Sequence, residues 1–535
     1  MFKTKDLKVT FLGITPVLRD ETGYLKPQDI VALSALMTFK GKSVKDLYAE
    51  AKEKGQDIEK KVKTIIRKSS LRGHASIATT PAICFTYEAS KFVDSLMTGM
   101  VFSSSLMASG RRTDTTIEDI VYPSSIDKSK EAKIIYKKAS EENINFLNNL
   151  LSQGIGKDDA SKVLQYGIYG TGIIAYPIES VIAFKKEIES QGDWMPEEAK
   201  MMVSEIEKKL KEYGVDLIYA SRELAARNTL PYPNIFKDPA KTNLAREYVK
   251  KNGISDEFID VIDFNATVTP GLEKAAGEIY KKTKETAVDK ETIKNSWRKL
   301  LDLRHDLMRD FSTALNIKLL SSVSWRVWSE KKRHRTAQMT PDSLYYSIDR
   351  ARVVFEKMRK KITNRKLNVE DLQKIDRVFT IPPVIKPSND QLYGYLDRII
   401  NSLDIYYELI EKHDIKPSDA IFVMPRGVRV DIIQNYDLYN LIGGYYTLRT
   451  CSTAEVQLRQ MTLIEMVKIK ATLVKNGLSN LAKIMVTKCH IPGFCLEEKN
   501  CQVIKGLVKD YDETFHEEMK AQLDEEFDQN LSKLK

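Results

Sequence analysis

Cysteine is scarce in this sequence, with five cysteines among 535 residues. An odd number of cysteines, in a chain whose first six residues carry charge where a signal peptide would be apolar, is typical of a reducing compartment. Long apolar runs are also missing. The longest, residues 168–184, contains Pro177 and Glu179 and is too short to span a bilayer. We therefore expect a cytoplasmic protein with no membrane partner.

Recognisable nucleic-acid motifs are absent too. The sequence has no RGG tract, no zinc-finger spacing and no aromatic RNP-like strand, although the net charge is +10. The charge is uneven, because residues 510–535 hold nine acidic residues against three lysines. The basic remainder predicts anionic ligands, which suits nucleotide substrates and a dinucleotide cofactor as well as nucleic acid. We expect no nucleic-acid partner, but a nucleic-acid-binding protein remains an alternative.

Landmarks recur in one order along the chain. Each half has a strand, turn and helix, a Leu-Arg-(Gly)-His group, a long helix, and a short turn before a further apolar segment. The pairs are residues 9–16 and 261–270, 71–74 and 303–305, 132–151 and 392–410, and 154–167 and 414–427. Spacings of this size predict duplication of a whole domain and not a short repeat.

The duplication sets the expected domains. We predict a first copy over 1–245, a second copy over 246–510 and an acidic tail over 511–535. The junction is expected near Pro231–Asn234 or in the polar stretch 237–255, where turn residues and charge replace apolar periodicity. Residues 357–377 are expected to be an insertion before the second long helix. The tail is interpreted as a solvated helix with no assigned function.

The most informative group is Arg333, His334 and Arg335, followed after seven residues by Ser343. Two guanidiniums and an imidazole within three residues suit an anionic ligand, because arginine binds phosphate or an enolate-like oxygen through paired, charged hydrogen bonds. Alone, the group is also compatible with a basic surface turn.

This order and spacing resembles the signature of flavin-dependent thymidylate synthases, the thymidylate synthase complementing proteins. Two further segments are similar to that family: residues 448–459, which begin with Leu448-Arg449, and Gly73-His74-Ala75-Ser76 with Phe85-Thr86-Tyr87 downstream. The resemblance implies an α+β fold, in two tandem copies, each with a mixed sheet flanked by long helices.

The resemblance also implies roles for individual residues. The residues expected to bind the cofactor FAD are His74, Ser76, Arg333, His334, Arg335 and Asn440. Those expected to bind the substrate dUMP are Ser109, Arg111, Glu330, Arg333, Ser343 and Arg449. Within these sets, Arg449, His334 and Ser343 are expected to take part in catalysis. No metal is expected.

The implied reaction is the reductive methylation of dUMP to dTMP. Methylenetetrahydrofolate supplies the carbon, NADPH supplies the reducing equivalents through FAD, and no enzyme nucleophile attaches to the pyrimidine. Cys84 and Cys451 are therefore interpreted as packing residues. Members of the family are tetramers whose sites draw on several subunits, so the resemblance implies a homodimer of this chain, equivalent to a pseudo-tetramer.

The two halves differ in the motifs they carry. Counting along the first half places the uncharged Phe102-Ser103-Ser104 opposite the Arg-His-Arg group, whereas Tyr345 replaces the arginine of the Ser109-x-Arg111 loop in the second half. We interpret this as a division of labour between the copies.

Departures from the family pattern leave an inactive paralogue that binds flavin or nucleotide as an alternative. Pro341 stands where an acidic residue is expected, Glu330 stands for a glutamine, and Asn440 falls in Leu438-Tyr439-Asn440 where the family has Asn-x-Arg. Another open point concerns Cys489, His490, Cys495 and Cys501, whose spacing is compatible with zinc or with ordinary thiols. We expect thiols.

Overall fold

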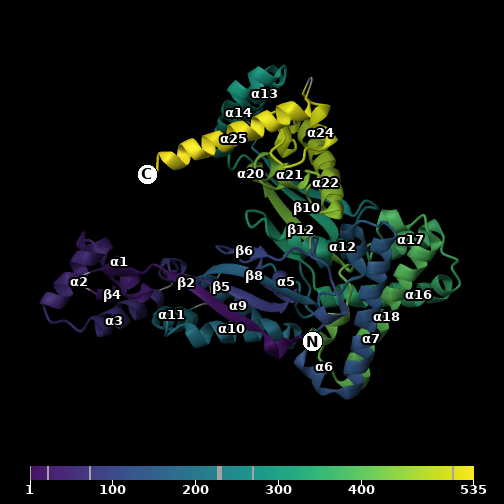
Figure 1. Ribbon diagram of the computed structural model, residues 1–535, viewed down its shortest axis with the longest axis horizontal. Coiled ribbons are helices and arrows are strands. Elements are labelled where there is room, and N and C mark those ends of the chain that lie inside the picture. The colour runs from purple at the N-terminus through teal and green to yellow at the C-terminus, as the bar shows by residue number, and fades with distance from the viewer. Residues whose placement is uncertain are drawn as a thin grey trace. The chain divides into compact units, whose positions relative to one another are not determined.

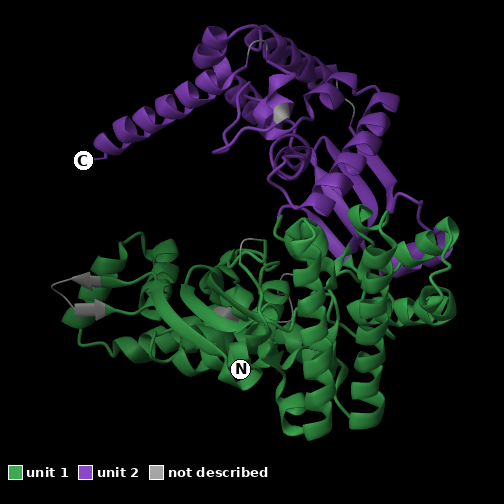
Figure 2. Cartoon of the chain, turned by 45° about the vertical axis from the view of Figure 1, so that its right-hand side comes forward, with its two compact units in different colours: residues 1–242, 324–335, 341–430 green, residues 243–323, 336–340, 431–535 purple. Residues whose placement is uncertain are grey.

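The computed structural model describes residues 2–20, 23–71, 74–111, 113–225, 232–267, 270–508 and 511–534. The chain divides into two compact units, which Figure 2 colours separately. Unit 1 comprises Met1–Thr242, Ser324–Arg335 and Pro341–Val430, and unit 2 comprises Asn243–Val323, Thr336–Thr340 and Asp431–Lys535. Neither unit is one continuous stretch, so the compact units do not follow the sequence boundary expected between the two copies.

The first copy contains a four-stranded sheet with strand order β2-β5-β8-β6 (Figure 1). Its strands are β2 (Lys8–Thr15), β5 (Ala82–Ser90), β6 (Ser104–Met107) and β8 (Tyr169–Pro177). Each neighbouring pair is antiparallel. Alternate residues of β5, including Ile83, Phe85 and Tyr87, are buried, as expected for a strand with one face toward a core.

The second copy repeats this topology. Its strands are β9 (Ile259–Ala266), β10 (Leu315–Ser324), β11 (Gln338–Pro341) and β12 (Arg429–Asp437). Read from β9, their order is β9-β10-β12-β11, so in both sheets the first and second strands pair and the fourth lies between the second and third. Two copies with the same unusual strand order confirm the duplication predicted from the sequence.

The helices also correspond between the copies. After the first strand come α1 (Pro27–Lys40), α2 (Val44–Glu53), α3 (Ile58–Leu71) and α4 (Ser76–Thr79) in one copy, and α13 (Pro270–Thr286) and α14 (Lys290–Asp310) in the other. After the second strand come α5 (Phe92–Met97) and α15 (Trp325–Lys331). After the fourth come α9 (Ile178–Gln191), α10 (Glu197–Lys209) and α11 (Asp216–Ala225), against α20 (Leu438–Ile442), α21 (Tyr445–Arg449), α22 (Val456–Lys475) and α23 (Ser479–Ile484).

The long helices expected near 132–151 and 392–410 are α7 (Lys130–Ser152) and α18 (Asn389–His413). The second copy has two additional helices before α18, namely α16 (Leu344–Thr363) and α17 (Val369–Asp376). The charged stretch 357–377 covers the end of α16 and all of α17. Short turns precede the last strand in each copy: α8 (Lys157–Ala160) and α19 (Pro417–Ala420).

Equivalent segments of the two copies meet in unit 1. Helices α7 and α18 lie side by side (Figure 1), and Asn143 Nδ2 donates a hydrogen bond to Ser402 Oγ at 3.1 Å. Gln165 and Pro425, which follow α8 and α19, form an antiparallel bridge. The rings of Phe92 and Phe422 stack with centroids 4.1 Å apart. These contacts place a shared core where the copies join.

Hydrogen bonds fix the residue correspondence at this junction. Lys91 N donates to Ile168 O at 2.8 Å, and Trp325 N donates to Val428 O at 2.7 Å. Lys91 therefore corresponds to Trp325, and the starts of β6 and β11 keep the same offset. The counterpart of the Arg-His-Arg group is then Gly99–Val101. The sequence-based choice of Phe102–Ser104 was shifted by three residues, but the counterpart is uncharged in either register.

The C-terminal segment belongs to unit 2. After α24 (Gln502–Lys505), helix α25 (Glu513–Ser532) follows. Phe515, His516 and Met519 on its first half are fully buried, with Phe515 and Met519 in a cluster with Phe494 and Ile504. A helix was expected here, but the expectation that it is solvated was wrong for its first half. Lys509 and Asp510 lie outside the described residues.

No helix in the described ranges is long and apolar enough to cross a membrane.

Candidate functional site

The Arg-His-Arg group lies directly after helix α15. Ser324 caps this helix by accepting a hydrogen bond from Val327 N at 3.2 Å, and the buried Trp325 and Trp328 anchor the helix in unit 1. The chain then turns, with Arg333 N donating to Glu330 O and His334 N donating to Lys331 O. Arg333, His334 and Arg335 are partly exposed. The buried helix thus presents the group at an accessible turn.

Both arginines of the group have unsatisfied hydrogen-bonding capacity. The Nε atoms of Arg333 and Arg335 are buried and have no hydrogen-bond partner. Arg335 Nη2 donates to Thr98 O at 3.2 Å, but neither guanidinium forms an ion pair with any acidic residue that the structure describes. A buried donor without an acceptor costs about 1–3 kcal/mol, more if charged. The geometry therefore favours an acceptor-rich ligand at this position.

Arg426 is a third such arginine, and sequence reasoning missed it. Its side chain is 2% exposed, its guanidinium lies 4.5 Å from the ring centroid of Tyr166, and its Nε donates to Gln165 O at 3.1 Å. Its Nη2 is buried without a partner, and burial lowers the pKa of Arg426 to about 10. The only signal in the sequence was an arginine between Pro425 and Gly427 just before a strand.

Two buried lysines complete what we call the cationic cluster, which is defined by Lys91, Lys332, Arg333, Arg335 and Arg426. Lys332 donates a hydrogen bond to Ser95 O. Burial lowers the pKa of Lys91, and the charges of Arg426 and Arg333 act in the same direction. Burial also holds the pKa of Lys332 well below its usual range, again with help from neighbouring arginines.

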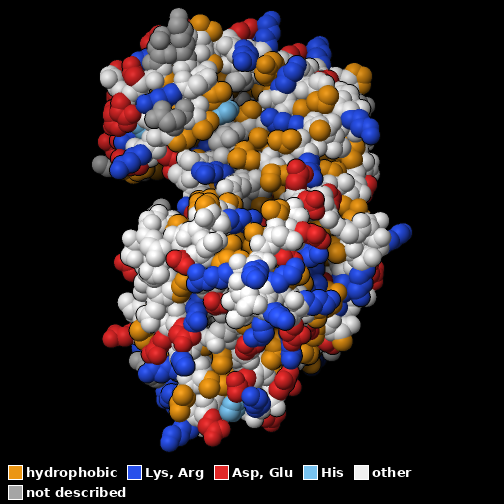
Figure 3. Space-filling model, turned by 90° about the vertical axis from the view of Figure 1, so that its right-hand side faces the viewer, with side chains coloured by type: hydrophobic (Ala, Val, Ile, Leu, Met, Phe, Trp, Pro, Cys, Tyr) orange, Lys and Arg blue, Asp and Glu red, His pale blue; other side chains and the backbone are white. Residues whose placement is uncertain are grey.

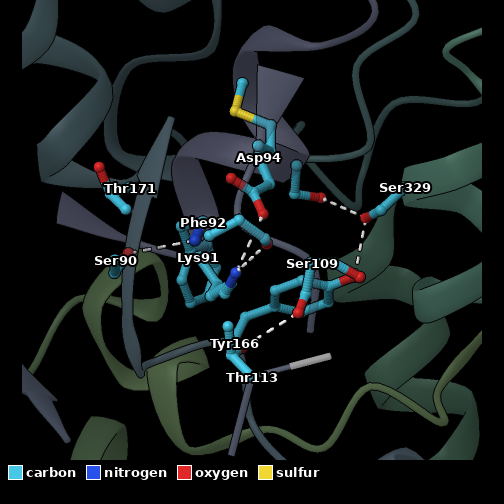
Figure 4. A network of polar contacts seen from close by, with 12 residues as sticks. Ser90, Lys91, Phe92, Asp94, Ser109, Thr113, Tyr166, Thr171 and Ser329 are labelled. Carbon is cyan, nitrogen blue, oxygen red and sulfur yellow. Dashed lines mark hydrogen bonds and ion pairs between the residues drawn. The ribbon is translucent and has the colours of Figure 1, made fainter. Parts of the chain in front are cut away.

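Asp94 is the acidic group that opposes this repulsion. Its Oδ2 lies 3.8 Å from Lys91 Nζ, and its Oδ1 accepts a short hydrogen bond from Tyr87 OH at 2.5 Å. Figure 4 shows Lys91 pointing toward Asp94. Asp94 balances only part of the charge of the three arginines in the cluster, so an excess of positive charge remains, which an anionic ligand would compensate.

The Ser109 loop borders the cationic cluster. A Cβ atom added to Gly110 would lie 3.6 Å from Arg426 Nη1, so the loop backbone approaches that guanidinium closely. Ser109 O accepts a hydrogen bond from Thr113 N, and Arg111 Nε donates to Asp158 Oδ1 at 2.7 Å. The structure thus brings the expected phosphate loop of the first copy to Arg426 of the second. Arg112 lies outside the described residues.

Ser343 and Glu330 are engaged within the fold. Ser343 is fully buried, donates to Lys237 O at 2.6 Å, and caps α16 by accepting from Tyr346 N at 3.4 Å. Glu330 pairs with Arg326 at 2.8 Å. These contacts hold both side chains within the fold. Their expected roles toward a substrate remain predictions.

His74 and Ser76 line a cavity of about 430 Å³ in the first copy. Its wall also includes Val31, Ala35 and Thr38 from α1, and Ile77 from α4. Both His74 and Ser76 are exposed. The cavity is therefore accessible, and the two residues matched to flavin contacts share it. Arg72 and Gly73 of the same motif lie outside the described residues.

The remaining predicted site residues belong to unit 2. Asn440 is fully buried, donates from Nδ2 to Asp437 Oδ1 at 2.7 Å and accepts from Thr336 Oγ1 at 3.0 Å. Arg449 ends α21 and is partly exposed. Burial raises the pKa of Tyr445, which the nearby charge of Arg449 opposes. Arg449 is thus held on a short helix beside a buried aromatic core.

Among the described residues, no three His, Cys, Asp or Glu side chains are grouped so that they could hold a metal ion. Cys489 and Cys495 are buried in the apolar cluster beside α25. Burial raises the pKa of the Cys489 thiol to about 12. Such thiols are suited to packing rather than to nucleophilic chemistry. Cys84 and Cys451 are also free thiols.

The chain belongs to the thymidylate synthase complementing protein family. The family model matches residues 22–186 and 265–472, which is more than half of the chain and one segment in each copy. The resemblance inferred from the motifs and the tandem arrangement are thereby confirmed.

Individual relatives are distant. A flavin-dependent thymidylate synthase of Aeropyrum pernix is 28% identical over 85 residues, which are 16% of this chain and 26% of that protein. The match therefore spans about a quarter of that curated relative. Crystal structures of a UMP/dUMP methylase, PolB from Streptomyces cacaoi, bound with 5-Br dUMP or 5-Br UMP, are 14% identical. The match covers 43% of this chain and 100% or 99% of those chains, with a TM-score of 0.32.

Proposed function

We propose that this chain is an FAD-dependent thymidylate synthase that converts dUMP to dTMP, with methylenetetrahydrofolate as carbon donor and NADPH as reductant. The observation that carries the proposal is the cationic cluster. It gathers Arg333 and Arg335 of the family motif with Arg426, and each has a buried nitrogen without an acceptor. A nucleotide phosphate supplies acceptors and negative charge together, so it meets both requirements of this site.

The described residues fit a flavin in two respects. The cavity beside His74 and Ser76 is accessible and, at about 430 Å³, is large enough for part of a dinucleotide. Arg333 and Arg335 are suited to offset the negative charge of a reduced flavin or of its diphosphate. Bound FAD would supply the reducing equivalents for the transferred carbon. The protein would contribute binding, orientation and electrostatic stabilisation.

Arg449 is proposed to act on the uracil ring. A guanidinium facing the uracil carbonyl oxygen would stabilise the negative charge that builds when C5 becomes nucleophilic. Helix α21 holds Arg449 against buried tyrosines, which restricts its position. Loss of such a group from a desolvated site lowers the rate on the order of 100-fold or more.

The test combines a flavin measurement with turnover. Purified protein should show flavin absorbance and oxidise NADPH only when dUMP and methylenetetrahydrofolate are present. Arg449→Ala should abolish dTMP formation and retain FAD, whereas His74→Ala should mainly weaken FAD binding. Matched controls are Arg309→Ala on α14, an exposed arginine paired with Asp310, and His413→Ala at the end of α18. Normal turnover by Arg449→Ala would refute its assignment to the uracil ring.

Two other outcomes point to different functions. Binding of FAD and dUMP without turnover would identify an inactive paralogue, which the departures at Pro341 and Glu330 favour. Binding of nucleic acid without flavin would support the polynucleotide alternative.

On the face drawn in Figure 3, lysine and arginine side chains are interspersed with acidic ones. Ion pairs such as Arg352–Glu411 and Arg359–Asp404 link α16 to α18, so these cations are partly neutralised.

A further inference from the structure

A cavity in unit 2 lies outside all the residues assigned above. Its volume is about 330 Å³, and it lies between the C-terminal half of α13, helix α14, α23, the chain that leads to α24, and α24 with the residues that follow it. Pockets of this size accommodate small organic ligands. Apolar side chains such as Ile484, Ile504 and Val508 form much of the wall. Each of these three is at most 2% exposed.

The charged part of the wall is cationic. Lys284, Arg304 and Lys483 line the cavity together with the imidazole of His490, and its described lining residues include no Asp or Glu. The ring of Tyr280 lies close to both lysines, with Lys483 Nζ at 5.2 Å and Lys284 Nζ at 5.9 Å from its centroid. Positive charge at the rim and an apolar floor suit a ligand that is anionic at one end and apolar at the other.

Arg304 is the deepest of these cations. It is 4% exposed and donates from Nη2 to Ile442 O at 2.6 Å. Burial lowers its pKa to about 10, and no acidic side chain contributes to that pKa. Because an uncompensated buried charge is costly, a carboxylate from a ligand would stabilise the guanidinium strongly. Arginine also binds a planar carboxylate through two parallel hydrogen bonds.

His490 provides a second polar atom without a partner. Its Nε2 is buried and makes no hydrogen bond, and burial lowers the pKa of the imidazole to about 4. The ring is therefore neutral at physiological pH and can donate or accept one further hydrogen bond. Nothing in the family motifs accounts for a histidine here.

The position of the cavity follows the duplication. In the first copy, the cavity at His74 lies against α1 and the end of α3. In the second copy, this cavity lies against α13 and α14, the corresponding helices. In the first copy His74 is followed by Ala75 and Ser76, whereas in the second copy His305 is followed by Asp306 and Leu307. The second copy therefore lacks the serine of the flavin motif. The second copy thus has a cavity beside the corresponding helices, but different residues line it.

We propose that this unit 2 cavity is a binding site for an aryl or similarly apolar monocarboxylate, held by Arg304 at the carboxylate and by the apolar floor at the ring. The proposal is independent of the proposed reaction. Arg304 also contacts Ile442 at the end of α20, which precedes the helix that carries Arg449.

The test is a fluorescence titration of the purified full-length chain with 2-naphthoate, compared with the neutral 2-naphthylmethanol. We expect saturable binding of the acid and at least tenfold weaker binding of the alcohol. Arg304→Met should weaken 2-naphthoate binding at least tenfold. Because a buried substitution can impair folding, Lys284→Met with Lys483→Met provides a second variant at the exposed rim, with an expected severalfold loss.

Lys505→Met is the matched control, because Lys505 lies on α24 in the same unit but does not line the cavity. It should bind 2-naphthoate as the unchanged protein does. Equal affinity for acid and alcohol, or no saturable binding at millimolar concentration, would overturn the proposal. So would unchanged affinity in both cavity variants. The titration needs neither flavin nor dUMP, so its failure would leave the proposed synthase activity untouched.

Discussion

Two buried arginines three residues apart illustrate how a side chain can serve either stability or ligand binding. Arg429 Nη2 lies 2.8 Å from Asp376 Oδ1. Burial alone would raise the pKa of Asp376, but the charge of Arg429 and its hydrogen bond hold that pKa below its usual range. Arg426 instead stacks on Tyr166 and keeps a buried Nη2 without a partner. Arg429 therefore stabilises the fold, whereas Arg426 is suited to bind an anionic ligand.

This contrast predicts opposite effects of the same substitution. Arg426→Met should leave the thermal midpoint of the ligand-free protein unchanged or higher, because it removes repulsion within the cationic cluster, yet dUMP should no longer stabilise the protein. Arg429→Met should lower the midpoint, since breaking a buried ion pair costs up to about 3–5 kcal/mol, and Lys386 Nζ, 3.2 Å from Asp376 Oδ2, compensates only part of that loss. Calorimetry of both variants with and without dUMP measures this. A ligand-free Arg426→Met protein destabilised as strongly as Arg429→Met would show that Arg426 is structural.

Glu198 provides a prediction for pH. It lies on α10, is fully buried, and accepts hydrogen bonds from Ser90 N at 2.9 Å and from Ser90 Oγ. Burial raises the pKa of Glu198 to about 7 despite these hydrogen bonds. A raised folded-state pKa means that its stabilising contribution is complete below the ordinary glutamate pKa and is lost as pH rises through about 7.

As the pH rises from 5 to 8, the unchanged protein should therefore lose stability relative to the Glu198→Gln variant. The difference in unfolding free energy should change by about 3 kcal/mol at most over that range. Thermal midpoints at both pH values measure it, with Glu205→Gln as control, because Glu205 is also on α10 and forms an ion pair with Lys208 away from Glu198. A parallel pH response of the unchanged protein and Glu198→Gln would mean that Glu198 is ionised throughout.

At the scale of elements, periodicity and landmarks predicted much of the fold. Apolar stripes identified the long helices α7 and α18, because residues three and four apart share one buried face. The same reasoning could not find Arg426, since a single arginine before a strand carries no pattern. It also could not foresee that the capping hydroxyl of Ser343 is bonded to Lys237 O, because that contact joins segments 106 residues apart.

The tail helix α25 was misjudged for a related physical reason. Its acidic composition predicts solvation, but Phe515 and Met519 lie one turn apart and fill a cluster that includes Phe494. Its second half differs, since Phe527 and Leu531 are 66% and 49% exposed. Composition averaged over the helix therefore concealed one buried turn.

We predict that the two halves of α25 differ in their effect on stability. A chain that ends after Leu523 loses the surface ion pair between Arg298 and Glu526, which is worth about 1 kcal/mol or less. Phe515→Ala should cost about 3–5 kcal/mol, because it leaves a cavity in a closely packed core. Urea denaturation monitored by tryptophan fluorescence compares them, since Trp297 packs against Phe494. Equal losses would contradict this division of the helix.

At the scale of the whole molecule, duplication has left each functional motif in one copy. The His74 cavity belongs to the first copy, and the Arg-His-Arg turn belongs to the second. At the position that corresponds to the His74 motif, the second copy has His305 followed by Asp306. At the position that corresponds to the Arg-His-Arg turn, the first copy has the uncharged Gly99–Val101. Within unit 1, Gly110 of the first copy approaches Arg426 of the second. A chain that carries one set of motifs is therefore suited to build one nucleotide site, although it has the bulk of two family subunits.

This partition predicts the stoichiometry of the assembly. We expect a homodimer of full-length chains, equivalent in size to a tetramer of single-copy subunits, with about one FAD per chain, because neither copy retains both flavin motifs. Sedimentation or light scattering gives the mass, and flavin absorbance against protein concentration gives the FAD content. His74→Ala should lower the FAD content toward zero without changing the mass, which separates cofactor binding from assembly. Two FAD per chain would show that the second copy has retained a flavin site, and a monomer at working concentration would contradict the pseudo-tetrameric arrangement.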